Sequence, residues 1–183
     1  MKLGLTINTD ILMIASGNSD KGEKDPQLKQ HCQDVIGWML ESDAAMLVID
    51  DDNTIKQEYI KTMGDAGYGI QFVKEMAVNF KLEVVQRFHG GKWFRLNQKM
   101  GKELGRQFAL HKGDDTFGRT AMASTDRIIV ADEAHFKNAA SVLKKHSNVT
   151  MLTPEDAVAR TKSLAPCPHC HESKPSVVSS PSK

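Results

Sequence analysis

Acidic and amide side chains recur directly after apolar, strand-like segments of this sequence. Asn8 and Asp10 follow the first such segment, and Asp132 and Glu133 follow a later one, Arg127–Ala131. Clustered carboxylates repel one another unless a cation lies between them, and oxygen ligands with several waters suit Mg²⁺ or Mn²⁺. The pattern therefore predicts a divalent-metal site. Such a metal activates water and neutralises charge on a phosphodiester, which is nuclease chemistry.

Further acids stand at the starts of predicted helices. Asp114 and Asp115 open one helix, Glu58 lies one turn into another, and Asp50 to Asp52 form an acidic turn after the segment Ala44–Ile49. Helix caps and first-turn acids are expected at most of these positions, at Asn8 and Asp10, and at Asp132 and Glu133. Residue type alone leaves both roles open, capping and metal binding.

The elements that must position these residues alternate along the chain. Strands are predicted for Lys2–Ile7, Ala44–Ile49, Leu82–Val85, Arg127–Ala131 and Asn148–Leu152. Helical patterns separate them, with Gly17–Asp25 as a polar loop and no hairpin signal, and Thr153-Pro154-Glu155-Asp156 starts a last helix. The expected fold is α/β, a three-layer, mainly parallel sheet with helices on both faces. Ligands bind outside the carboxyl ends of such strands, where the acids lie.

The segment Ile7-Asn8-Thr9-Asp10-Ile11-Leu12 resembles the opening strand and turn of PIN domains. Glu58-Tyr59 is similar to the second acidic position of that family, and Asp114-Asp115-Thr116-Phe117 to the third. Ile128 to Phe136 resembles the strand and acidic turn that carry the fourth. The resemblance covers residues 1–152 in order and spacing.

The resemblance implies a metal-dependent ribonuclease. Glu58, Asp114 and Glu133 would be carboxylate ligands of Mg²⁺ or Mn²⁺, with Asp10 or Asn8 completing the set and Asp115 and Asp132 as neighbouring candidates. The first aspartate of the family falls on Asn8, whose amide oxygen brings no negative charge. This departure keeps a second hypothesis open, a catalytically impaired module that binds nucleic acid or a protein.

A basic, amphipathic segment spans Lys92 to Leu110 and is predicted as one helix. Its charged and aromatic side chains are candidates for phosphate contacts and base stacking. A solvated helix surface is the alternative for each of them. The candidate nucleic-acid-binding residues are Lys92, Trp93, Arg95, Lys99, Lys102 and Arg106.

Composition changes to Pro, Ser, Lys, Cys and His from Ala165 onward, which predicts a domain at 1–164 and a flexible tail at 165–183. The tail carries half of a structural zinc site in a Cys-x-x-Cys knuckle. The knuckle has three alternative roles. It binds Zn²⁺ together with ligands from a second subunit or another protein, it forms a redox pair, or it binds metal adventitiously. The candidate ligands are Cys167, His169, Cys170 and His171.

The 183 residues carry a formal net charge of only +1, so any polyanion must be met by local patches. No apolar run is long enough to span a bilayer and the first ten residues lack a signal-peptide layout, which predicts a cytoplasmic protein without membrane contact.

The family resemblance implies RNA as substrate, with DNA open, and use as a toxin or antiphage effector. An inhibitor protein, a larger assembly or a homodimer would be the partners. A nucleotide-binding flavodoxin-like domain is disfavoured, because no glycine-rich loop follows the first strand.

Overall fold

The computed structural model describes residues 2–86, 88–89, 92–93 and 114–164. The elements in chain order are β1 (Leu3–Ile7), α1 (Thr9–Ser16), α2 (Asp20–Lys24), α3 (Pro26–Glu41), β2 (Ala45–Asp50), α4 (Thr54–Met63), α5 (Tyr68–Val78), β3 (Leu82–Val85), β4 (Phe88–His89), β5 (Lys92–Trp93), α7 (Asp114–Ala123), β6 (Ile128–Val130), α8 (Ala134–Ser147), β7 (Thr150–Leu152) and α9 (Pro154–Lys162).

A parallel five-stranded sheet in the order β3-β2-β1-β6-β7 forms the centre of the described chain, which confirms the predicted α/β class. Every residue of β1 and β6 is buried, whereas the edge strands β3 and β7 are largely half-exposed. Central strands of a parallel sheet are covered on both faces, so they read as continuous apolar runs. The sequence shows this pattern fully in β6 and, apart from Thr6, in β1.

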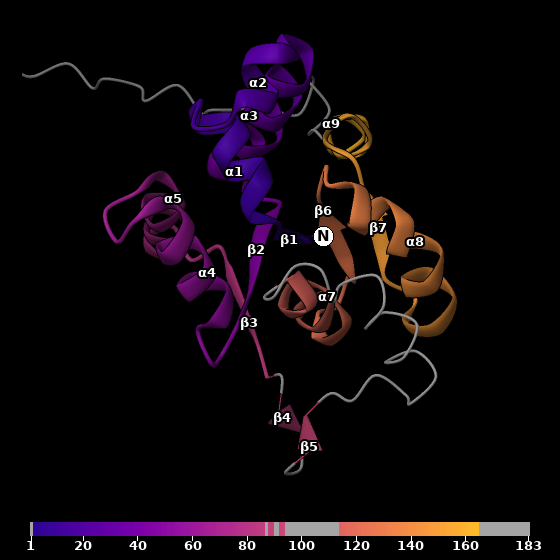
Figure 1. Ribbon diagram of the computed structural model, residues 1–183. Helices are drawn as coiled ribbons and strands as arrows, with labels where there is room; N and C mark the ends of the chain where they lie inside the picture. The colour runs from indigo at the N-terminus through magenta and orange to yellow at the C-terminus, as the bar shows by residue number, and fades with distance from the viewer. Residues whose placement is uncertain (1, 87, 90–91, 94–113, 165–183) are drawn as a thin grey trace, which may run out of the picture.

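Helices cover the two faces of the sheet and give a three-layer arrangement (Figure 1). On one face α3 and α5 pack against β2, and α9 packs on α3. On the other face α7 lies across β1, β2 and β6. Right-handed crossovers require this division, because the chain runs from β1 to β3 in one direction and from β3 to β7 in the other.

The helix starts follow the signals in the sequence. Asn8 caps α1 by accepting from the backbone N–H of Thr9, and Asp25 caps α3 by accepting from Leu28 N at 2.9 Å. Thr153 caps α9 in the same way, ahead of Pro154. α1 then ends at Gly17, which adopts φ +81, a conformation that favours glycine.

Two local predictions are wrong. The expected polar loop at Gly17–Asp25 contains α2, whose first turn is capped by the Ser19 hydroxyl. The expected helix does not begin at Lys92, because Lys92 and Trp93 form β5 and pair antiparallel with His89 and Phe88 of β4 (Figure 1). The two intervening residues are glycines, a dipeptide typical of tight hairpins. The remainder of the expected helix, residues 94–110, lies outside the described chain.

Candidate functional site

The candidate site lies at the carboxyl ends of β1 and β6, which are neighbours in the sheet. Ile7 pairs with Val130, and the backbone N–H of Asn8 donates to the carbonyl oxygen of Val130 at 3.0 Å. The chain leaves these two strands in opposite directions, toward β2 from one and toward β7 from the other. A divergence of this kind opens a crevice at the sheet edge, where α/β proteins commonly bind ligands.

Asn8 and Glu133 contact each other across this edge. The Nδ2 atom of Asn8 donates to Oε2 of Glu133 at 3.0 Å, although 125 positions separate the two residues in the chain. The Oδ1 atom of Asn8 accepts from Thr9 N at 2.8 Å. Nε2 of His135 lies 3.5 Å from the same Glu133 oxygen. The side chain of Asn8 therefore does two things: its oxygen caps α1, and its amide N–H binds Glu133, one of the predicted metal ligands.

Asp10 is the most unusual carboxyl group of this edge. Its Oδ2 accepts from the backbone N–H of Asp132 at 3.0 Å, while its Oδ1 is buried and has no hydrogen-bond partner among the described residues. Burial, followed by the negative charge of Glu133, raises the pKa of Asp10 to about 7. This carboxyl group therefore holds its proton to a higher pH than an ordinary aspartate, unless a cation takes the place of the proton.

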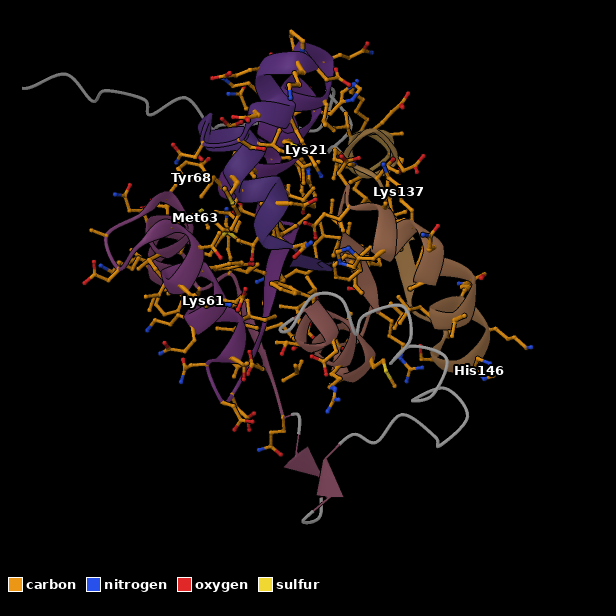
Figure 2. All side chains as sticks on the ribbon, in the orientation of Figure 1. Lys21, Lys61, Met63, Tyr68, Lys137 and His146 are labelled. Atoms are coloured by element: carbon orange, nitrogen blue, oxygen red, sulfur yellow. The ribbon has the colours of Figure 1, made fainter. Side chains whose placement is uncertain are left out.

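Asp132 lies between two lysines. Lys137 of α8 places its Nζ 2.7 Å from Oδ1 of Asp132, and Nζ of Lys21 from α2 lies 3.8 Å from Oδ2. Figure 2 shows both lysines near the ends of α2 and α8. Asp132 is thus already compensated by protein cations, which makes it a poorer metal ligand than Asp10 or Glu133.

The helices α4 and α7 stand beside the end of β1 and are held there by buried aromatic rings. Tyr59 is fully buried and its hydroxyl donates to the carbonyl oxygen of Ile7 at 2.6 Å. The ring of Phe117 in α7 lies 6.2 Å from the ring of Tyr59, centroid to centroid. This packing fixes α4 and α7 beside the carboxyl end of β1.

The acids of α4 and α7 themselves make local ion pairs. Glu58 pairs with Lys61, which is labelled in Figure 2, at 3.5 Å. Asp115 pairs with Arg119 at 2.7 Å. Asp114 is the first residue of α7. In the described part of the chain, no three His, Cys, Asp or Glu side chains lie close enough together to hold a metal ion as a group.

The structure thus brings Asn8, Asp10, Asp132 and Glu133 into one network and leaves Glu58 and Asp115 in separate pairs. Of the other predicted site residues, Asp114 begins α7 and Lys92 and Trp93 form β5, and the rest lie outside the described chain. These outside residues are Arg95, Lys99, Lys102, Arg106, Cys167, His169, Cys170 and His171.

Two contributors to this edge were not predicted from the sequence, Lys21 and Lys137. Lys137 lies one helical turn past an acidic turn, a spacing that permits contact and provides a usable signal. Lys21 has no such signal, because the polar sequence around it predicts a loop rather than α2. Cys32 of α3 is also near, and burial followed by the charges of Asp10 and Asp132 raises its pKa to about 12, so it remains a thiol.

No protein family, curated protein or solved structure with which the chain was compared matches it. Among the described helices, none has both the length and the apolar character required to cross a membrane. The fold class is thus set by the parallel sheet, and any functional assignment depends on the residues at its carboxyl edge.

Proposed function

We propose that this protein is a divalent-metal-dependent endoribonuclease of the PIN-like class that hydrolyses phosphodiester bonds of single-stranded RNA. The observation that carries the proposal is the buried Oδ1 of Asp10, which has no hydrogen-bond partner among the described residues and lies beside Glu133 at the junction of β1 and β6. Hard oxygen donors in this setting fit Mg²⁺ or Mn²⁺, because a cation would relieve both the lost hydration and the carboxylate repulsion.

Asp10 and Glu133 are the residues that would hold the metal, with waters completing the coordination. Glu58 and Asp114 stay candidate ligands through the family resemblance alone, because no three such side chains lie close together among the described residues. The bound metal would supply Lewis-acid activation of water and charge neutralisation at the phosphate. The other side chains have separate roles. Tyr59 fixes α4 against β1, and Asn8 orients the Glu133 carboxylate through its 3.0 Å hydrogen bond.

Lys21 and Lys137 would receive a phosphate of the RNA backbone. Both ammonium groups now face Asp132, and a phosphate entering beside it would share them. With a net charge of only +1, the protein must rely on such local cations rather than on a general positive field. The same proposal includes a toxin or antiphage role in the cytoplasm. Its expected partners are an inhibitor protein and a second copy of the chain.

The second candidate function is a PIN-like module that binds nucleic acid or a protein without cutting. It is favoured by the amide of Asn8 at the first acidic position and by the engagement of that amide with Glu133. It is also favoured by the ion pairs that occupy Glu58 and Asp115.

Cleavage of single-stranded RNA separates the two candidates. The parent protein should cut RNA with Mn²⁺ or Mg²⁺ and not with a chelator, and Asp114→Asn or Glu133→Gln should abolish cutting without loss of folding. Asn8→Asp should maintain or raise activity by adding a charge to the site. Glu75→Gln, a change on the surface of α5, is the matched control. Activity that survives both chelation and Asp114→Asn would refute a metal-dependent nuclease, and no cleavage by the parent would favour the binding module.

A further inference from the structure

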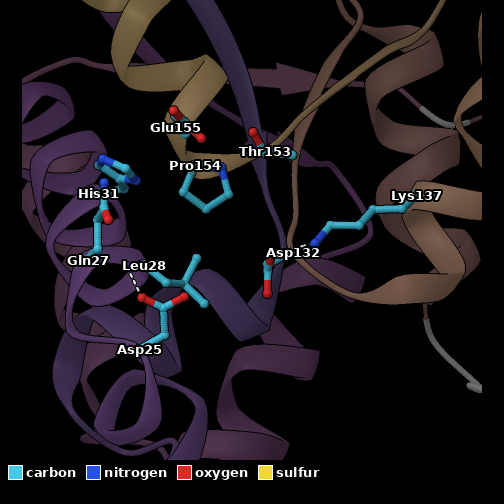
Figure 3. A pocket seen from close by; sticks show the side chains of 9 residues that line it. All are labelled: Asp25, Gln27, Leu28, His31, Asp132, Lys137, Thr153, Pro154 and Glu155. Carbon is cyan, nitrogen blue, oxygen red and sulfur yellow. Dashed lines mark hydrogen bonds and ion pairs between the residues drawn. The ribbon is translucent and has the colours of Figure 1, made fainter.

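A cavity of about 280 Å³ adjoins the candidate site on the side of Asp132. It lies between the first turns of α3 and α9 and the β6–α8 connection, as Figure 3 shows. Asp132 and Lys137 form one wall, and Asp25 and Glu155 belong to the walls contributed by α3 and α9. Because Asp132 precedes Glu133 directly, a molecule in this cavity is a neighbour of any phosphate held at the sheet edge.

Several polar side chains of the cavity are free to bind a ligand. The side chains of Gln27, His31 and Glu155 make no hydrogen bond or ion pair to other residues in the part of the chain that the structure describes. Asp25 uses Oδ1 to cap α3. The cavity therefore offers both acceptors and donors that the fold itself does not use.

The mixture of groups selects against simple ligands. Three carboxylates, those of Asp25, Asp132 and Glu155, would repel a bare anion. The ammonium group of Lys137 opposes a bare cation, and the lining is too polar for a purely apolar molecule. A neutral ring with donors on one edge and acceptors on another fits this lining.

The cavity also has apolar surface for such a ring. Pro154 is buried at the start of α9, and Leu28 is half-buried in α3, and both face the cavity. Figure 3 shows Asp25 and Glu155 toward the α3 and α9 side and Lys137 reaching in from α8 on the other side. Guanine carries N–H donors on its Watson–Crick edge and the O6 and N7 acceptors on the adjacent edge. Uracil has no amino group to donate.

We infer that this cavity is a nucleobase subsite with preference for guanine, occupied by the nucleotide next to the phosphate at the candidate site. The carboxylates of Glu155 or Asp25 accept from the N1 and N2 hydrogens, and Lys137 donates to O6 or N7. The choice of a nucleotide as ligand rests on the proposed function. The binding itself requires neither a metal nor catalysis.

The test measures binding of guanosine, adenosine, cytidine and uridine 5′-monophosphates to the full chain by calorimetry in the presence of a chelator. Phosphate contacts are common to the four probes, so differences report the base. Guanosine monophosphate should bind about tenfold or more tightly than uridine monophosphate. Equal binding of all four, or no binding of the guanosine probe at millimolar concentration, would overturn the inference.

Two variants assign the preference to this cavity. Glu155→Gln and Asp25→Asn each remove one carboxylate, and asparagine still caps a helix, so α3 is maintained in the second variant. Each should reduce the ratio of guanosine to uridine monophosphate affinities, whereas Glu41→Gln, at the exposed far end of α3, should leave it unchanged. A ratio that stays at the parent value in both cavity variants would contradict the assignment.

Cleavage experiments distinguish failure of the subsite from failure of the proposed function. If the protein cuts RNA at all bases equally and binds the four probes equally, the base subsite is wrong and the nuclease proposal stands. If guanosine monophosphate is preferred and no RNA is cut under any condition, the subsite stands and the nuclease proposal is wrong.

Discussion

At the scale of single residues, the candidate site depends on how differently three neighbouring carboxyl groups are compensated. Asp132 has two lysines, Glu133 has the Asn8 amide, and Asp10 has one backbone N–H and a buried oxygen without a partner in the described chain. Burial and like charge disfavour the ionised form only where compensation is missing. Asp10 is therefore the position where a proton or a metal ion is most needed.

The raised pKa of Asp10 predicts how stability changes with pH. Its folded-state pKa of about 7 exceeds the ordinary value of 3.8, so the folded state binds more protons between these two values. The free energy of unfolding therefore falls as pH rises through this window, by at most about 1.4 kcal/mol per pH unit from this group. Asp10→Asn, which resembles the protonated form, should raise the melting temperature in chelator more at pH 8 than at pH 5.

The matched control for this prediction is Asp65→Asn, a change at an exposed carboxylate between α4 and α5. Its effect should be small at both pH values. If Asp10→Asn lowers the melting temperature equally at pH 5 and pH 8, the conclusion that the Asp10 carboxyl group is buried without a compensating charge is wrong.

Metal addition gives a second prediction at this scale. Mn²⁺ should raise the melting temperature of the parent at pH 8, because the ion binds only the folded site; at a hundred times its dissociation constant the gain is about 2.7 kcal/mol. The double variant Asp10→Asn, Glu133→Gln should show little of this gain. Calorimetric unfolding with and without millimolar Mn²⁺ checks it, and an unchanged parent melting temperature would count against the metal site.

At the scale of elements, the position of α4 relative to β1 depends on one buried tyrosine. Tyr59 packs near Phe117 of α7 and donates its hydroxyl to the Ile7 carbonyl, one residue before Asn8. Burial raises the pKa of this hydroxyl, so it stays a donor at any ordinary pH. A single side chain thus fixes two helices at the end of the strand that begins the site.

Tyr59→Phe should cost about 1 kcal/mol, because it removes a buried hydrogen bond while maintaining the ring. For a chain of this size the loss corresponds to a melting temperature about 2–4 °C lower. Tyr68→Phe is the matched control, because the Tyr68 hydroxyl makes no hydrogen bond within the described residues. Equal effects of the two changes in thermal unfolding would show that the Tyr59 hydroxyl does not stabilise this junction.

At the scale of the whole molecule, the sheet and its two helical layers end with α9. Ala157 and Val158 of α9 are buried, and the helix packs on α3, so it belongs to the core. The sequence after Leu164 has no apolar periodicity comparable with that of α9. Stability should therefore depend on residues up to 164.

Removal of residues 165–183 should leave the melting temperature unchanged, whereas removal of residues 153–183 should prevent stable folding, because it exposes the surface of α3 that α9 covers. Circular dichroism and thermal unfolding of the two truncated chains, beside the full chain, check both statements. If removal of residues 165–183 lowers the free energy of unfolding by several kcal/mol, as expected for a lost structural zinc site, the prediction is contradicted.

The sequence by itself determined the type and order of the central elements. The run Ile128–Val130 is continuously apolar and Leu3–Ile7 is polar only at Thr6, because both faces of these strands are covered, and this is a local property of the chain. The capping residue Thr153, followed by Pro154, marked the start of α9 in the same way. The sequence also showed that Asn8, Asp10, Asp132 and Glu133 follow strands, and hence that they meet at one edge.

Only the tertiary structure decided which of these acids is compensated. Lys21 and Asp132, or Asn8 and Glu133, are more than 100 positions apart, and neither pairing leaves a pattern in the local sequence. The pKa of Asp10 likewise depends on burial and on through-space charges from the β6–α8 connection and from α2. Electrostatic environment is a property of distances between elements, and these distances exist only when the chain is folded.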